Sequence, residues 1–175
     1  MNKYLKMGLL GCLLIVAIVA NWRYSSPTSG DLHEGVHYHA GFRVYIDGVL
    51  QDYSDYKYMN FVPCSEHDEK KSPAEEQIEK AHLHDGVGDV VHVHRSGSTW
   101  GDLFKNIQVE LPKDKELKGY IGGALSENIM EAPITEYTTA IFIVGENQSS
   151  HDKEIVSIDH IKEVEAKSEL CGTGE

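Results

Sequence analysis

The chain has 175 residues, 41% of them hydrophobic, which suits one compact domain or two small ones. Its formal net charge is −12 at pH 7. The first thirty residues contain Lys3, Lys6 and Arg23 but no acidic residue, so the negative charge lies in the remainder. A strongly acidic domain repels nucleic-acid phosphates and attracts cations, so we do not expect nucleic acid as a partner.

The N-terminus predicts a membrane anchor. Lys3 and Lys6 precede an apolar run from Met7 to Ala20. This run is shorter than the about 20 residues of a full span, but flanking apolar side chains extend it. A cleaved signal peptide and a lipoprotein processed at Cys12 are the alternatives. We expect an uncleaved signal anchor over residues 1–23, in a single-pass cell-membrane protein whose C-terminal domain faces the extracytoplasmic side.

The rest of the chain predicts an α+β fold. A linker over residues 24–30 leads into a His-rich β-sheet domain over residues 31–110, and an α+β region over residues 111–175 packs on it. We expect the sheet to be antiparallel, with a few helices packed on its apolar face.

The clearest strand pattern runs from Val36 to Ile46, where the residues alternate strictly. Even-numbered positions are apolar or aromatic, whereas the odd-numbered ones include His37 and His39. Because successive strand side chains point to opposite faces, both imidazoles share the face opposite the apolar one. Asp47-Gly48 then predicts a type I′ turn, followed by a partner strand from Val49 to Tyr53.

A second histidine pattern runs from Ala81 to Arg95, after a polar segment that ends in a short predicted helix over residues 74–80. Two His-x-His pairs flank a loop rich in Gly and Asp, which predicts a hairpin. A hairpin centred on Gly88 places His82 opposite His94 and His84 opposite His92. Any centre on a residue keeps all four imidazoles on one face, with opposed Cβ atoms about 4.5–5.5 Å apart.

Capping and periodicity predict the remaining elements. Thr99 to Asp102 resemble a capping box, which begins a helix from Trp100 to about Gln108. Strands are expected at Lys118–Ile121 and Tyr137–Val144, and a helix from Ser157 to Leu170.

Six histidines form three His-x-His pairs in phase with the strand period. The predicted metal ligands are therefore His37, His39, His82, His84, His92 and His94. An all-imidazole set suits Zn²⁺, Cu²⁺ or Ni²⁺ rather than Ca²⁺ or Mg²⁺. Asp85, Asp89 and Glu34 are expected to orient imidazoles through their second ring nitrogen.

Three functions fit this pattern. The first is a membrane-tethered extracytoplasmic protein that captures or hands over zinc or copper. The second is a metalloenzyme, hydrolytic or copper-dependent, that keeps an open coordination position. The third is a structural or interaction domain without metal, whose histidine face responds to pH. The sequence contains no P-loop, nucleophile elbow or His-Glu-x-x-His pattern.

The three cysteines and the histidines outside the His-x-His pairs are not among the predicted metal ligands. Cys12 lies in the anchor and is expected to be inert, whereas Cys64 and Cys171 either form a disulfide bridge or remain free thiols. Polar segments place three more histidines on the surface: His67, His151 and His160.

Residues 37–48 (HYHAGFRVYIDG) and 81–104, which include HLHDG, VVHVH and TWGDLF, resemble a group of small, membrane-anchored, uncharacterised prokaryotic proteins. Some of these are labelled protein-disulfide isomerases. That activity requires an activated thiol pair, typically Cys-x-x-Cys. This chain has no such pair, so we do not expect isomerase activity.

Overall fold

Six strands form one mixed sheet in the computed structural model, which describes residues 35–60, 71–146 and 154–167. The hydrogen-bonded order is β2-β1-β6-β4-β5, and β3 pairs with β1 off this path. The strands are β1 (Gly35–Ile46), β2 (Val49–Leu50), β3 (Val90–Arg95), β4 (Leu117–Ile121), β5 (Ala124–Ser126) and β6 (Thr139–Val144). The helices are η1 (a 3₁₀ turn, Tyr56–Tyr58), α2 (Pro73–Lys80), α3 (Trp100–Asn106) and α4 (Ile158–Lys167).

The α+β class is confirmed, but the expectation of a purely antiparallel sheet is wrong. Strand β6 runs parallel to β1, from the pair Gly41 and Thr139 to the pair Ile46 and Val144. All the other strand pairs in the described residues are antiparallel. Parallel neighbours need a long crossover, and here the chain between β1 and β6 includes β3, α3 and the β4–β5 hairpin.

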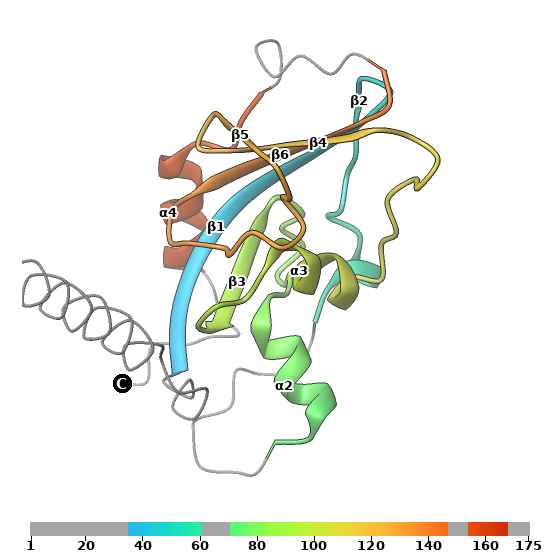
Figure 1. Cartoon of the computed structure of the whole chain (residues 1–175). Helices are drawn as coiled ribbons and strands as arrows, with labels where there is room; N and C mark the ends of the chain where they lie inside the picture. Colours follow the sequence, from blue (N-terminus) through green and yellow to red (C-terminus); the bar gives the residue numbers. More distant parts are fainter. Residues whose placement is uncertain (1–34, 61–70, 147–153, 168–175) are drawn as a thin grey trace, which may run out of the picture. The chain divides into compact units, whose positions relative to one another are not determined.

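The alternation along β1 predicts its two faces correctly. The even-numbered residues Ala40, Phe42 and Val44 are buried in the main core. This core continues through the apolar residues between and beside the histidines, Leu83, Val91 and Val93. Helix α3 closes it from one side (Figure 1), with rings of the β1, α3 and β6 side chains in edge or tilted contact.

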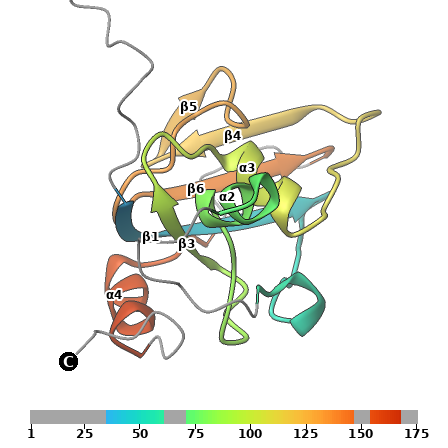
Figure 2. The same cartoon turned by 90° about the horizontal axis from the view of Figure 1, so that it is seen from below.

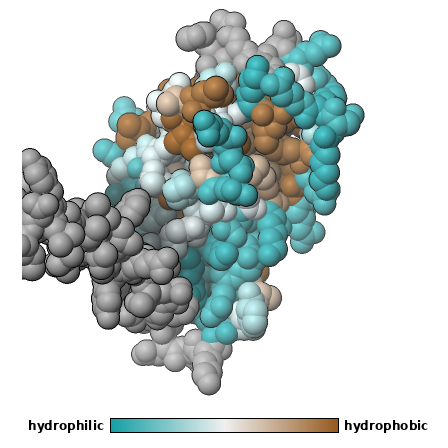
Figure 3. Space-filling view, in the orientation of Figure 1, coloured by the Kyte–Doolittle hydropathy of each residue, from teal (hydrophilic) through white to brown (hydrophobic). Residues whose placement is uncertain are grey.

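The predicted capping box at the start of α3 is present. The Thr99 side chain accepts a hydrogen bond from the Asp102 backbone N–H, and the Asp102 carboxylate accepts one from the Thr99 N–H. Trp100, Leu103, Phe104 and the following Ile107 are buried, as expected. Helix α2 begins with a second capping box, at Ser72, and buries no residue. Its polar surface is teal below the centre of Figure 3.

Helices cover both faces of the sheet, not only the apolar face as expected. Gly41 lies on the odd-numbered face of β1, and a Cβ atom there would meet the Cβ of Val156 at 2.6 Å and the Cδ1 of Ile161 at 3.2 Å. Helix α4 therefore packs on the face opposite α3, as the two views also show (Figures 1 and 2). The absence of a side chain at Gly41 makes this close approach possible.

The other predicted elements are found with small changes in their ends. Asp47 and Gly48 have φ angles of 50° and 83°, which fit a type I′ turn. The partner strand β2 is only Val49–Leu50, because the chain then leaves the sheet for η1. Strands β4 and β6 and helix α4 lie where the pattern places them.

The predicted anchor over residues 1–23, the linker and the three cysteines lie outside the described residues. Within residues 35–60, 71–146 and 154–167, no helix combines the length and the apolar character that crossing a membrane requires.

Candidate metal centre

Three segments bring six histidines to one face of the sheet. His37 and His39 come from β1, His92 and His94 from β3, and the third pair from the segment before β3. In the antiparallel β1–β3 pairing His39 lies opposite His92, and an isolated bridge places His82 opposite His92 on its other side. The convergence inferred from the strand period is therefore found in the structure.

The register of the predicted hairpin is wrong by two residues. His82 exchanges both backbone hydrogen bonds with His92, at 3.0 and 2.9 Å, rather than lying opposite His94. The cause is a tight turn directly after His84, whose carbonyl accepts a hydrogen bond from the Val87 N–H. A shift of two residues preserves the side-chain face, so all four imidazoles still point the same way.

The imidazoles form two rows across the three segments. In the outer row, the ring centroid of His94 lies 4.8 Å from that of His37 and 5.3 Å from that of His82. The His94 ring is nearly parallel to both, with interplanar angles of 9° and 6°. In the inner row, the ring centroid of His92 lies 3.8 Å from that of His39 and 3.4 Å from that of His84. His92 thus occupies the centre of the cluster.

Burial differs along the cluster. The whole inner row is at most 2% exposed, and His82 is 4% exposed. His94 is half-buried and His37 is exposed. An ion can therefore reach the cluster at His37, while the inner row lies out of contact with solvent.

Oxygen atoms lie beside the Nδ1 atom of three imidazoles, and two of these nitrogens are hydrogen-bonded. His82 donates from Nδ1 to the Ile78 carbonyl at 3.1 Å, and His84 donates from Nδ1 to the Asp85 carboxylate at 2.6 Å. His39 Nδ1 lies 3.4 Å from the Glu165 carboxylate but makes no hydrogen bond with it. Because these oxygens only accept, a neutral imidazole facing them carries its proton on Nδ1 and keeps a lone pair on Nε2. This is how outer residues prepare a histidine to bind a metal.

Of the three acidic residues expected around the site, Asp85 lies as predicted. Asp89 instead contacts Arg43 at 3.3 Å and His160 at 3.1 Å, which joins α4 to the sheet. Glu34 lies outside the described residues. His160, expected at the surface, is partly exposed in this contact, and His67 and His151 are also outside the described residues.

Sequence reasoning missed Glu165. It lies on α4, and its carboxylate also accepts a hydrogen bond from the Tyr137 hydroxyl at 2.6 Å. Nothing in the spacing of the sequence connects Glu165 with His39, because the contact depends on α4 packing across the histidine face. The one local signal is the apolar stripe of α4. It indicates that this helix packs on the rest of the domain, but it does not indicate which face of the sheet the helix covers.

Burial holds the imidazoles neutral. It lowers the pKa of His82 and of His39 to about 4, with a neighbouring imidazole as the next cause for each. Burial lowers the pKa of His94 to about 3, and it also lowers the pKa of His84 and of His92. Five of the six predicted ligands are therefore neutral near pH 7, the form that binds a metal ion.

The ring nitrogens of one group of histidines lie close enough together that they could hold a metal ion. Single ring nitrogens of His37, His92 and His94 all lie within 4.8 Å of one another. Nitrogens bound to one tetrahedral zinc ion lie about 3.3 Å apart, given Zn–N bonds of about 2.0–2.1 Å. The three imidazoles would therefore have to move closer together to bind one ion.

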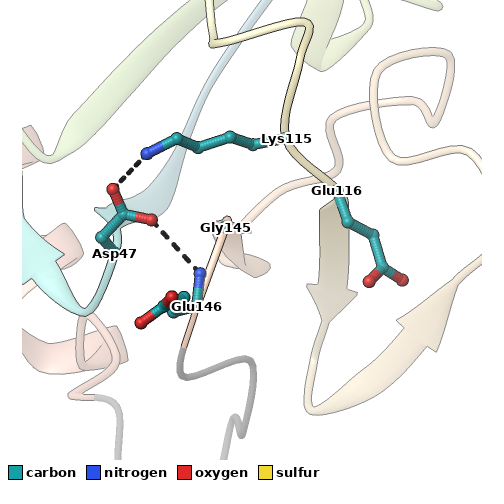
Figure 4. A pocket seen from close by; sticks show the side chains of 5 residues that line it. All are labelled: Asp47, Lys115, Glu116, Gly145 and Glu146. Carbon is teal, nitrogen blue, oxygen red and sulfur yellow. Dashed lines mark hydrogen bonds and ion pairs between the residues drawn. The ribbon is translucent and has the colours of Figure 1, made fainter.

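A shallow pocket at the opposite end of β1 is a weaker candidate (Figure 4). It is lined by Asp47, Lys115, Glu116, Gly145 and Glu146. The Asp47 carboxylate already pairs with the Lys115 ammonium and accepts the Glu146 backbone N–H. These contacts join the β1–β2 turn to the ends of β4 and β6, which is a structural role.

Comparison with family models, with curated proteins and with solved structures gave no match. Fold and site together define the chain as an α+β domain with a six-histidine cluster on its sheet, in which His37, His92 and His94 can hold a metal ion.

Proposed function

We propose that this chain is a membrane-tethered, extracytoplasmic protein that captures and hands over zinc or copper. The observation that carries the proposal is the convergence of ring nitrogens of His37, His92 and His94 to within 4.8 Å of one another. The low pKa values of the buried imidazoles support it, because protons do not compete for these nitrogens near neutral pH. The exposure of His37 supports exchange of the ion with solvent or with a partner.

The choice of zinc or copper follows from the ligand type. Neutral imidazole suits both ions, and the Irving–Williams order favours copper over zinc at equal availability. The membrane anchor and the extracytoplasmic location are inferred from the N-terminal sequence and its resemblance to membrane-anchored proteins.

A metalloenzyme is the second candidate, and the exposure of His37 favours it, because a three-imidazole site that reaches solvent at one ligand leaves a coordination position for water. Added azide should shift the visible spectrum of the Co²⁺-loaded chain if that position is open. The pH-sensing alternative is disfavoured, because burial lowers the pKa of His39 and of His82 to about 4 and the pKa of His94 to about 3.

The proposal is tested by the metal content of the purified full-length chain. We expect the wild type to contain stoichiometric zinc or copper. His92→Ala should contain at least tenfold less metal, and His160→Ala, the matched histidine control, should contain as much as the wild type. Equal metal content in the wild type and His92→Ala would show that the assigned ligands are wrong.

The location is tested separately in intact cells. The chain should remain in membranes after an alkaline carbonate wash, and added protease should digest its C-terminal domain without lysis. Protection from protease until lysis would place the domain in the cytoplasm and would overturn this part of the proposal.

A further inference from the structure

We propose that the inner row of His39, His92 and His84 is a second coordination position, so that the cluster takes up two divalent transition-metal ions. The first ion binds His37, His92 and His94 at the exposed end. This inference rests on the proposed function and extends it from one ion to two positions of different burial.

Carboxylates flank the inner row at both ends. His84 Nδ1 lies 2.6 Å from Asp85, and His39 Nδ1 lies 3.4 Å from Glu165, which the Tyr137 hydroxyl orients at 2.6 Å. The His84 end therefore has the carboxylate–histidine hydrogen bond that orients metal ligands. At the His39 end the carboxylate lies beside Nδ1 without a hydrogen bond. A divalent ion among residues that are at most 2% exposed needs compensating negative charge, and two carboxylates supply it.

The facing nitrogens of the inner row have nearly the spacing of two ligands on one ion. His39 Nε2 and His92 Nε2 are 3.0 Å apart, close to the about 3.3 Å expected for a tetrahedral ion. Without a metal, the Nε2–H of His92 donates a hydrogen bond to His39 Nε2, because His39 carries its own proton on Nδ1. An ion at each position leaves His92 bound through both ring nitrogens, so its single proton is released to solvent and His92 is shared as an imidazolate. His39 stays neutral and keeps its Nδ1 proton.

The two positions share His92. Its ring lies 3.4 Å from that of His84 and 6.0 Å from that of His37. Loss of this one imidazole should therefore weaken both binding steps, whereas the other histidines and the carboxylates each act mainly on one.

The test is a titration of the metal-free full-length chain with Co²⁺ and with Zn²⁺, followed by visible absorption and native mass spectrometry. We expect two ions per chain, with the tighter step at the inner row. Asp85→Asn and Glu165→Gln should weaken only the tighter step, by about 10–100-fold, and His37→Ala should remove only the weaker step. Glu163→Gln, on the same helix, is the matched control and should bind as the wild type.

Asp85→Asn is chosen because Asp85 has a φ angle of 59°, which asparagine tolerates. If that variant does not fold, Glu165→Gln decides the question. One ion in the wild type, or two ions with both carboxylate variants matching Glu163→Gln, would overturn the second position but leave the proposed function standing. Binding of no ion by the wild type would overturn both.

Discussion

Two residues that hold the histidine cluster from outside have unusual backbone conformations. Asp85, which accepts a hydrogen bond from His84, has a φ angle of 59°, and Tyr137, which donates one to Glu165, has a φ angle of 53°. A positive φ is costly for residues other than glycine, above all for a bulky aromatic one. Such strain concentrates at functional sites and persists only where the surrounding structure maintains it, which agrees with a cluster held in position from several elements.

The neutral imidazoles should make the stability of the metal-free chain depend on pH. In the unfolded chain a histidine binds its proton near pH 6.5, whereas burial lowers the pKa of His82 to about 4 in the folded state. The unfolded state therefore binds more protons below pH 6.5. The folded state should therefore lose stability as the pH is lowered from 6.5 to about 4. For each such imidazole, the unfolding equilibrium constant should rise about tenfold per pH unit.

Urea unfolding at pH 7, 6 and 5 in the presence of a chelator measures this effect. The variant His82→Gln should show a shallower dependence than the wild type, and His160→Gln should retain the full slope. A wild type equally stable at pH 7 and pH 5 would contradict the prediction.

At the scale of elements, the contact between α4 and β1 positions the Glu165 carboxylate. Gly41 leaves room for Val156 and Ile161 to lie directly on the strand. Farther along the same face, the Tyr45 hydroxyl donates to the Glu154 carbonyl at 3.2 Å. These contacts fix α4 along β1, and they bring Glu165 to His39.

Gly41→Ala should separate α4 from the sheet. A methyl group there would lie 2.6 Å from the Cβ of Val156, so we expect a loss of stability of about 1–3 kcal/mol from overpacking. The double variant with Val156→Ala should lose less than the sum of the two single variants, because the second substitution removes atoms that the new methyl meets. Chemical denaturation of the four proteins measures this coupling, and additive losses would show that the contact is not the cause.

At the scale of the whole molecule, the histidine cluster joins segments that are far apart in the chain. The imidazoles come from β1, from β3 and from the segment that precedes β3, and the Glu165 carboxylate comes from the C-terminal helix α4. The cluster cannot form in the unfolded chain with this geometry. Metal binding and folding should therefore be coupled.

Zinc should raise the thermal stability of the chain. At a free ion concentration one hundred times the dissociation constant, one bound ion contributes about 2.7 kcal/mol, which corresponds to a rise in Tm of about 5–10 °C for a domain of this size. Differential scanning calorimetry with zinc and with a chelator measures the difference. His92→Ala should show no rise, and His160→Ala should show the same rise as the wild type. An identical Tm with zinc and with chelator would contradict metal binding by the folded state.

The local pattern of the sequence determined the elements and the faces of the strands that carry the site. Strict alternation in β1 predicted which side chains are buried and that His37 and His39 share the other face. The Asp47-Gly48 turn and the Thr99 capping box were also predicted, because both depend on residues within four positions of each other. These signals survive in any tertiary arrangement.

Only the tertiary structure decided how these parts meet. The parallel pairing of β6 with β1, the position of α4 on the histidine face, the two-residue register shift and the contact between Glu165 and His39 all depend on long-range packing. Period-two alternation specifies a face but neither a neighbour nor a register, since shifts of two residues leave every side chain on the same side. The composition of the site was therefore readable from the chain, whereas its geometry arose from contacts between distant segments.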